Sequence, residues 1–208
     1  MPTGLVVKNA GALVPRARVL FHARVRVLFL ENDDSFTWNV VEALPCRRSD
    51  VVLRPGRLGV PALDGVDAVI VGPGPTDPVR AGLVGAVRAV AAARRPLLGI
   101  CLGHQALGLA FGARLIRSAP VHGKVSTVHF APSRLFPGIA GPEPVMRYHS
   151  LALADVAPPL RVVAATDDGL PMAIEHESLP MAGLQFHPDS YATPHGREMI
   201  AAFFEAAR

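Results

Sequence analysis

A cysteine between two glycines is the strongest candidate for chemistry in this chain of 208 residues. Cys101 follows a short apolar run, with Gly99 two positions before it and Gly103 two positions after it. This spacing is the nucleophile-elbow pattern, in which a strained strand-to-helix turn exposes the nucleophile and small neighbours let strand and helix approach. The dipole of the following helix would favour the thiolate, and the Leu102 N–H would face the reacting carbonyl as an oxyanion donor. The alternative is a buried structural cysteine in a glycine-rich turn.

A cysteine nucleophile needs a base or a cationic partner, and eight histidines compete for that role. His187 stands out because it directly follows an apolar run, in the segment QFHPDS. Catalytic groups in open parallel sheets gather at the carboxyl ends of the strands, where Cys101 is also expected. Asp189, two residues further on, could orient the imidazole. We therefore predict that His187 is the partner of Cys101, with an ordinary surface or core histidine as the alternative.

A glycine- and proline-rich loop, Gly72-Pro73-Gly74-Pro75, follows another apolar run. Glycines let backbone amides approach a ligand carbonyl or carboxylate closely. The loop lacks the Lys-Ser/Thr pair of a phosphate loop and the spacing of a dinucleotide fingerprint. It therefore indicates either a binding loop for a small ligand or a plain rigid turn.

The elements that must position these groups alternate between strand and helix in the first half of the chain. This alternation predicts an α/β fold in which helices flank a mostly parallel central sheet. Asp34 or Ser35 can cap the first helix. We expect strands over 25–30, 51–53, 67–71 and 96–100, and helices from 34 or 35 to 44, over 79–93 and from 102 to 111.

Beyond Gly112 the pattern changes to short strands separated by turns, without an obvious helix until the last segment. Because no repeat and no linker is visible, we predict one domain over 25–208. Residues 1–24 are basic, free of acidic residues and without clear periodicity. We therefore expect either a disordered extension or one that results from a wrongly assigned translation start, with a transit peptide as the alternative. The additional short strands are expected over 114–117, 124–130, 145–148, 161–165, 172–175 and 182–186, and the closing helix over 195–207.

Composition and charge argue against several classes of function. Half of the residues are apolar and 18% are charged, which argues against disorder. The net charge of +4 comes from scattered Arg and Lys residues, so we do not expect nucleic acid as a partner. The two cysteines lack metal-ligand spacing, so no metal site is predicted and a reduced, cytoplasmic protein is expected. No apolar run reaches the ~18 residues of a membrane span.

Four segments together resemble the class I glutamine amidotransferases, in particular the amidotransferase subunit (component II) of anthranilate synthase or aminodeoxychorismate synthase. The similarity covers the chain from about residue 25 onward. The cysteine elbow and the FHP segment are shared across the class, whereas the segments DSFTWN and RYHSL resemble the chorismate branch. The matching segments are 32–39 (NDDSFTWN), 72–74 (GPG), 99–105 (GICLGHQ) and 185–190 (QFHPDS) with Thr193, His195 and Gly196, together with 122–124 (HGK) and 147–151 (RYHSL).

The resemblance implies a flavodoxin-like fold and a glutaminase reaction. Cys101 would attack the side-chain amide of L-glutamine, His187 would act as general base and acid, and water would release glutamate from the thioester. The residues that would hold glutamine are Gly72, Pro73, Gly74, Leu102, Gln105, Ser150 and Leu151. The oxyanion hole would use the amides of Leu102 and of Gly74 or its neighbour.

The resemblance also implies a partner, a chorismate-binding synthase subunit that receives the ammonia in a hetero-oligomer. No cofactor is expected in this subunit, and Mg²⁺ is expected in the partner synthase. We expect the partner to bind the face formed by residues 34–39, including Phe36 and Trp38, and the elbow. The product can be anthranilate or aminodeoxychorismate, and a phenazine-type synthase is an alternative because GPGPTDP is similar to its amidotransferase region.

The sequence departs from the family pattern at the third catalytic position, where Asp189 replaces glutamate. The shorter side chain withdraws the carboxylate by ~1.5 Å, the length of one carbon–carbon bond. Because aspartate orients histidine in serine-hydrolase triads, we predict a Cys-His-Asp triad and a working but slower glutaminase. The segment 44–67 is shorter and richer in proline than is usual in the family. We assign no function to Cys46, which lies within it.

Two further alternatives remain open at this stage. A stand-alone cysteine hydrolase of the α/β class would also have the elbow, although such enzymes place their acid before their histidine in the chain. A degenerate subunit would bind the partner without hydrolysing glutamine, and Asp189 is the only residue that favours this alternative.

Overall fold

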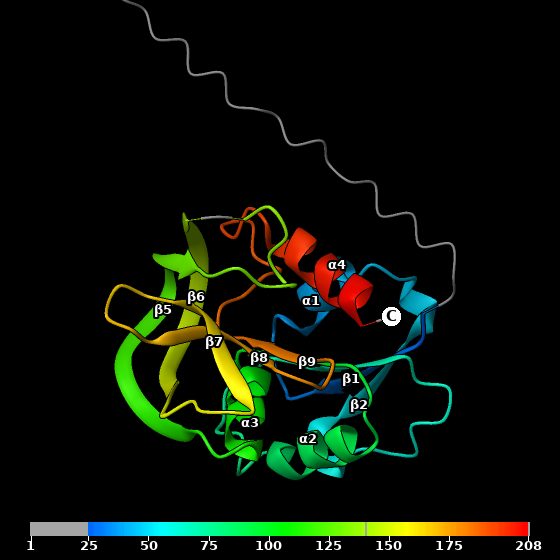
Figure 1. The fold of residues 1–208 in the computed structure, drawn as a ribbon. Helices are drawn as coiled ribbons and strands as arrows, with labels where there is room; N and C mark the ends of the chain where they lie inside the picture. The colour runs from blue at the N-terminus through cyan, green and yellow to red at the C-terminus, as the bar shows by residue number, and fades with distance from the viewer. Residues whose placement is uncertain (1–24, 140, 208) are drawn as a thin grey trace, which may run out of the picture.

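The computed structural model describes residues 25–139 and 141–207, and the extension predicted over residues 1–24 lies outside this range. A single sheet with the strand order β2-β1-β3-β4-β9-β8-β7-β5-β6 forms the centre of the described chain (Figure 1). Its strands are β1 (Val27–Glu31), β2 (Val51–Pro55), β3 (Ala68–Val71), β4 (Leu97–Ile100), β5 (Arg114–Phe130), β6 (Gly141–Ala154), β7 (Leu160–Ala165), β8 (Pro171–His176) and β9 (Met181–Leu184).

The sheet has two halves with different strand directions. In the parallel half, neighbouring strands of the order β2-β1-β3-β4-β9 all pair in parallel. In the antiparallel half, β8, β7, β5 and β6 pair antiparallel, and β9 joins the two halves by pairing with both β4 and β8. The predicted α/β class is confirmed, with the antiparallel strands attached to one edge of the parallel sheet.

Helices cover both faces of the parallel half because its strands are apolar on both sides. Val27 and Phe29 of β1 lie in the hydrophobic cluster with α1 and α4, whereas Leu28 and Leu30 lie in the cluster with α2 and α3. Alternate side chains of a strand point to opposite faces, so an unbroken apolar run fits a strand that is buried twice. Figure 1 shows the two helical layers. The helices are α1 (Thr37–Ala43), α2 (Leu83–Ala92), α3 (Leu102–Ala110) and α4 (Gly196–Ala206), with short 3-10 turns at Arg48–Asp50 and Gly56–Leu58.

Two helices begin later than predicted, because a carboxylate orders the turn that precedes each of them. Asp34 accepts a hydrogen bond from the backbone N–H of Phe36 at 2.8 Å, and α1 begins at Thr37 instead of residue 34 or 35. Asp77 accepts hydrogen bonds from two backbone N–H groups, and α2 begins at Leu83 instead of residue 79. The turn that Asp77 caps is separated from α2 by Gly82, which has a left-handed conformation with φ 71°.

The largest difference from prediction lies in β5 and β6. We expected three short strands over 114–117, 124–130 and 145–148, but the structure has two long paired strands. Register shifts between Arg117 and Val121 and between His122 and Lys124 let the pairing continue through the irregular segment 118–123. At the other end of the sheet, β2 forms the edge strand, although the segment 44–67 that contains it is short.

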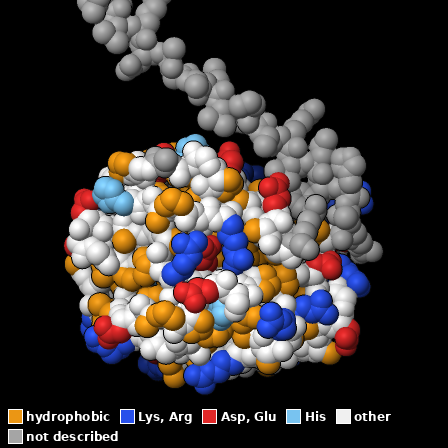
Figure 2. Space-filling view, viewed as in Figure 1, with side chains coloured by type: hydrophobic (Ala, Val, Ile, Leu, Met, Phe, Trp, Pro, Cys, Tyr) orange, Lys and Arg blue, Asp and Glu red, His pale blue; other side chains and the backbone are white. Residues whose placement is uncertain are grey.

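Charged side chains are dispersed over the surface of the described chain. On the face seen in Figure 2, Lys and Arg side chains lie singly or in small groups among acidic and uncharged ones. Within residues 25–139 and 141–207, none of the helices has both the length and the apolar character required to cross a membrane.

Candidate active site

Cys101 lies in a strained turn between β4 and α3. Its backbone has φ 52° and ψ −98°, a conformation that costs a non-glycine residue about 1–3 kcal/mol and persists only where surrounding contacts fix it. Those contacts are present, because the Cys101 N–H donates to the carbonyl of Leu184 in β9 at 2.8 Å, and its carbonyl accepts from the Gln105 N–H at 3.2 Å. The chain therefore holds a buried thiol at the start of a helix in elbow geometry.

The glycines around Cys101 are required by close backbone packing. A Cβ atom on Gly99 would lie 2.4 Å from backbone atoms of Gly103. A Cβ atom on Gly103 would lie 2.1 Å from the carbonyl oxygen of Val71 in β3. Both distances are far below normal carbon contacts, so only glycine allows β3, β4 and α3 to meet around the elbow.

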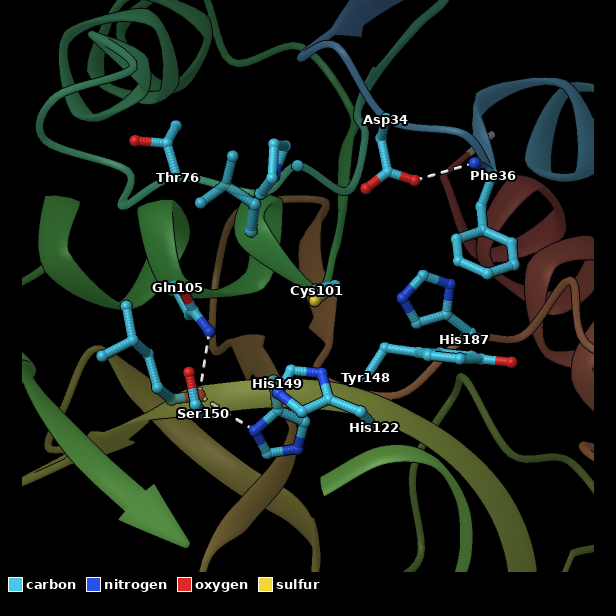
Figure 3. Close-up of a pocket in the computed structure, with 14 residues that line it drawn as sticks. Asp34, Phe36, Thr76, Cys101, Gln105, His122, Tyr148, His149, Ser150 and His187 are labelled. Atoms are coloured by element: carbon cyan, nitrogen blue, oxygen red, sulfur yellow. Dashed lines mark hydrogen bonds between the residues drawn. The ribbon is translucent and has the colours of Figure 1, made fainter. Parts of the chain in front are cut away.

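His187 enters the same site just after β9. Two hydrogen bonds fix its backbone, because its N–H donates to the carbonyl of Met146 at 2.9 Å and its carbonyl accepts from the Thr193 hydroxyl at 2.8 Å. Figure 3 shows its imidazole close to the Cys101 sulfur. The structure thus brings together two residues that are 86 positions apart in the sequence.

Asp189 lies beside His187, but its contact with the imidazole is not a well-formed hydrogen bond. The His187 Nδ1 and the Asp189 Oδ1 are 3.3 Å apart, close enough for an ion pair. Within the described chain, neither the imidazole Nδ1 nor either carboxylate oxygen has a hydrogen-bond partner, although the Asp189 side chain is only 1% exposed. The carboxylate is therefore close enough to stabilise the charge of His187, although it is not well aligned as a hydrogen-bond acceptor.

These neighbours determine the charge of His187. Burial alone would lower the pKa of His187, but the nearby Asp189 and Cys101 outweigh burial and raise the pKa to about 10. The imidazole is therefore protonated at neutral pH. A protonated histidine beside a cysteine stabilises the thiolate, which is the nucleophilic form of the side chain.

Two other histidines near the elbow, His149 and His104, are weaker proton acceptors than His187. The Arg147 Nε donates to the His149 Nε2 at 3.0 Å, so the His149 Nδ1 carries the proton that it donates to the Leu151 carbonyl at 2.9 Å. Burial first, and then the charge of Arg147, lower the pKa of His149 to about 4. His104 is fully buried in α3, and burial lowers its pKa to about 3. Both rings are therefore neutral and bind a proton only weakly, unlike the imidazole of His187.

Cys101 and His187 open into a cavity of about 350 Å³ between the two halves of the sheet (Figure 3). Most of the residues predicted to bind glutamine are in its wall. The lining residues are Asp34, Phe36, Gly74, Pro75, Thr76, Cys101, Leu102, Gln105, His122, Tyr148, His149, Ser150, Leu151 and His187.

Gly72, Pro73 and Asp189 are the predicted site residues that lie outside this lining. Gly72 is packed behind the wall, where a Cβ atom would lie 2.6 Å from the ring of Phe29 and where its carbonyl accepts from the Asn32 amide at 3.1 Å. It supports the loop from behind, while Gly74 faces the cavity.

The amide of Gln105 is fixed across the two halves of the sheet. Its Nε2 donates to the Leu151 carbonyl at 3.0 Å and to the Gln185 Oε1 at 3.2 Å. The Gln185 Nε2 in turn donates to the Cys101 sulfur at 3.7 Å. This chain of contacts links the nucleophile to the strand that carries Ser150 and Leu151.

Sequence reasoning did not place several lining residues in the site. Phe36 was assigned to the partner surface, but its ring contacts His187. Tyr148 and His122 were noted only within matching segments, and Thr76 was not singled out. The available signal was their position within those segments, which does not reveal where a side chain points. Within the described residues, no group of three or more His, Cys, Asp and Glu side chains could hold a metal ion.

Comparisons with known proteins connect this geometry to a family. A family profile described as "Glutamine amidotransferase class-I" matches residues 28–207. The chain is 39% identical over 189 residues to anthranilate synthase component 2 of Thermus thermophilus, covering 87% of this chain and 92% of that protein. It is 40% identical over 190 residues to aminodeoxychorismate synthase of Streptomyces griseus, covering 86% of this chain but only 26% of that longer protein.

Solved structures show the same fold at lower sequence similarity. A Thermoplasma acidophilum protein described as a putative GMP synthase subunit superposes with a TM-score of 0.80 at 22% identity, covering 89% of this chain and 95% of that chain. A glutamine amidotransferase from Thermotoga maritima superposes with a TM-score of 0.67 at 18% identity, covering 86% of this chain and 83% of that chain.

Proposed function

This chain belongs to the class I glutamine amidotransferase family, and from this premise we propose that it hydrolyses L-glutamine and delivers the ammonia to a chorismate-using synthase subunit. The observation that carries the proposal is the strained Cys101 beside His187 in one cavity, where the contacts of His187 raise its pKa. The names of the relatives, anthranilate synthase component 2 and aminodeoxychorismate synthase, support the choice of acceptor.

The proposed reaction begins with attack of the Cys101 thiolate on the side-chain amide carbon of glutamine. The negative charge that develops on the amide oxygen is stabilised by the backbone N–H groups of Leu102 and Gly74. In the loop of residues 73–75, Gly74 is the only possible amide donor, because Pro73 and Pro75 have no N–H.

His187 then moves protons in both halves of the reaction. The imidazolium donates its proton to the leaving nitrogen, the carbon–nitrogen bond breaks, and ammonia leaves a thioester on Cys101. The neutral imidazole next takes a proton from water, which attacks the thioester and releases glutamate. The thiolate and the imidazolium are thereby regenerated. We assign the remaining glutamine contacts to Gln105, Ser150 and Leu151, which line the cavity. Figure 3 shows Gln105 and Ser150 on the side away from His187.

We assign Asp189 the third position of the triad, where it stabilises the charge of His187 across 3.3 Å. Because this contact is not a good hydrogen bond, we expect the wild-type enzyme to be slower than an Asp189→Glu variant whose carboxylate reaches the imidazole. Glutamate release from both proteins, each with its partner present, measures the difference. Absence of turnover in the wild type would support the degenerate-subunit alternative instead.

The proposed partner surface lies next to the cavity. A second hollow of about 350 Å³ is lined by Asp34 and Trp38 together with residues at the end of β2, and Asp34 lines both spaces. Trp38 is 48% exposed, which is unusual for so large an apolar side chain. We propose that the synthase subunit covers Trp38, so that ammonia passes between the subunits without reaching bulk water. Mg²⁺ belongs to that partner, and a cytoplasmic location stays a prediction.

One experiment separates this function from its alternatives. The chain is combined with a candidate synthase subunit, and glutamate, ammonia and the chorismate-derived product are measured. We expect glutamine-dependent product, and we expect Cys101→Ala to abolish glutamate release while leaving activity with added ammonia intact. Ester hydrolysis without glutaminase activity would favour the stand-alone hydrolase. Failure of a glutamine-analogue diazo-ketone to label Cys101 would favour the degenerate subunit. The identity of the product distinguishes anthranilate, aminodeoxychorismate and a phenazine precursor.

A second experiment tests the partner surface. Trp38→Ala removes an exposed aromatic side chain of the kind that often dominates interface energetics, so we expect affinity for the synthase subunit to fall about tenfold or more. Trp38 is a better probe than Phe36, because Phe36 also contacts His187. Val79→Ala, at a residue that is 65% exposed and outside both cavities, is the matched control. Equal affinity of the Trp38→Ala variant and wild type would place the interface elsewhere.

A further inference from the structure

Two aromatic rings enclose the imidazole of His187. The ring centroid of Phe36 lies 5.1 Å from that of His187, and the centroid of Tyr148 lies 5.0 Å from it, with interplanar angles of 67° and 76°. Phe36 and Tyr148 also contact each other, at a centroid distance of 4.8 Å. All three distances are in the range of favourable aromatic contacts, and Figure 3 shows the three rings together. We call Phe36 and Tyr148 the aromatic clamp.

The carboxylate side of the imidazole offers a weaker constraint on orientation. The His187 Nδ1 lies 3.3 Å from Asp189 but makes no hydrogen bond of good geometry, and both Asp189 oxygens lack a hydrogen-bond partner in the described chain. A charge attracts the imidazolium without fixing the rotation of the ring. Because a misplacement of 1 Å can cost ~100-fold in rate, another contact must keep the imidazole in place.

The two rings of the clamp are held from different parts of the fold. The backbone of Phe36 is fixed at the start of α1, where its N–H donates to Asp34 at 2.8 Å. Tyr148 lies in β6 opposite His122 of β5. The clamp therefore fixes the imidazole at the junction between the parallel half and the antiparallel half, where the cavity also lies.

We propose that Phe36 and Tyr148 are positioning residues that hold the His187 imidazole against the Cys101 sulfur, and that they supply much of the orientation that Asp189 does not supply. This role rests on the proposed function, because it concerns the proton transfers of the glutaminase reaction. The clamp acts through ring shape and contact, so the phenol hydroxyl of Tyr148 is not needed.

The first test compares variants that remove or keep a ring. Phe36→Leu and Tyr148→Leu each remove one side of the clamp, whereas Tyr148→Phe keeps the ring without its hydroxyl. In the complex with the synthase subunit we expect each leucine variant to lower kcat for glutamine about tenfold, with KM changed less than about threefold. We expect Tyr148→Phe to stay within about twofold of wild type in both constants. Tyr191→Leu, at a residue that is 94% exposed, is the control for loss of a nearby aromatic ring.

The second test does not require glutamine. The rate at which iodoacetamide alkylates Cys101 in the full chain is followed from pH 5 to 9, with the modified peptide identified by mass spectrometry because Cys46 is also free. We expect the leucine variants to need a higher pH than wild type for the same rate, since a displaced imidazolium stabilises the thiolate less. The titratable groups that interact with His187 are Cys101, Asp189 on its own segment and His149 on β6. His122 of β5 lines the same cavity, and all four residues are unchanged in these variants.

The outcomes separate the clamp from a general loss of structure and from the proposed function. A kcat within twofold of wild type in both leucine variants would overturn the proposal, as would a KM that rises as much as kcat falls or an equal defect in Tyr148→Phe. If a leucine variant does not fold, Phe36→Met replaces it, because methionine keeps the volume without the ring. If wild type releases no glutamate but the alkylation profiles shift as expected, the clamp stands and the proposed function fails.

Discussion

The parallel and antiparallel halves of the sheet contribute to the site in different ways. β1, β3 and β4 of the parallel half are almost entirely buried, and the strained Cys101 lies at the end of β4. By contrast, only Val128 and Phe130 are buried among the residues of β5 in the antiparallel half. A strained backbone persists only where its surroundings fix it, which agrees with the position of Cys101 among these buried strands. β5 and β6 of the antiparallel half supply the opposite wall of the cavity.

The largest expected effect comes from adding one carbon atom in the parallel half. In Gly103→Ala the new Cβ would meet the Val71 carbonyl at 2.1 Å, and neither backbone segment can move without disturbing the elbow. We expect a loss of about 3 kcal/mol in the free energy of unfolding and loss of glutaminase activity in the protein that still folds. Chemical denaturation and glutamate release measure the two effects. Unchanged stability would contradict the close packing of β3 against α3.

The next largest effect is expected in the antiparallel half and should leave the chemistry intact. Glu175 is buried in β8, where its carboxylate contacts Ser133 and the guanidinium groups of Arg134 and Arg161. We expect Glu175→Ala to lower the free energy of unfolding by about 2–3 kcal/mol. This loss is smaller than the loss expected on breaking a fully buried ion pair, because both arginines are partly exposed. Glu177→Ala, at an exposed neighbour, is the matched control. A large fall in kcat of the folded variant would show that the two halves are not separable in this way.

A third prediction concerns pH and the residue at the junction of the two halves. Contacts with Asp189 and Cys101 outweigh burial and raise the pKa of His187 from 6.5 to about 10, so the folded protein binds this proton more tightly than the unfolded chain does. The resulting stabilisation is complete below pH 6.5 and is lost as the pH rises through about 10. We expect its contribution to fall by about 2 kcal/mol between pH 7 and 9. Chemical denaturation of wild type and of His187→Gln at several pH values measures this contribution. If the free energy of unfolding depends on pH in the same way in both proteins, the prediction is wrong.

The smallest effect is expected from a second glycine substitution, this time in the antiparallel half. Gly123 has φ +66°, and an added Cβ would lie 3.4 Å from the ring of Tyr148, an ordinary contact. We therefore expect Gly123→Ala to lower the free energy of unfolding by about 1 kcal/mol, because alanine is strained in this backbone conformation. Most of the glutaminase activity should remain. The same two assays as for Gly103→Ala apply. Equal costs at both glycines would remove the distinction between the two halves.

Sequence reasoning identified the parallel half better than the antiparallel half, for a physical reason. The runs 68–71 and 97–100 carry no polar side chain, and such runs are typical of strands buried on both faces, so the elements around Cys101 were predicted almost to the residue. In β5 most side chains are exposed, so little hydrophobic pattern marks this strand. There the bulges at 117–121 and 122–124 depend on pairing between distant residues, which local sequence does not encode.

The same limit applies to the candidate site. The spacing around Cys101 depends on local backbone geometry, and the GICLG segment reveals it directly. The contacts of Phe36 and Tyr148 with His187 join three distant segments, so they emerge only from the folded structure. The geometry of Asp189 was also beyond sequence reasoning, because a shift of a single bond length decides between a hydrogen bond and a contact of charges.

The position of β9 has a consequence for protein synthesis. This strand comes almost last in the chain, yet it inserts beside β4 and supplies the carbonyl that fixes the Cys101 N–H, and His187 follows it directly. A growing polypeptide that has emerged from the ribosome only as far as residue 180 consequently has neither the completed elbow nor the imidazole. The Cys101 thiol therefore meets the His187 imidazole only when translation of the domain is nearly finished.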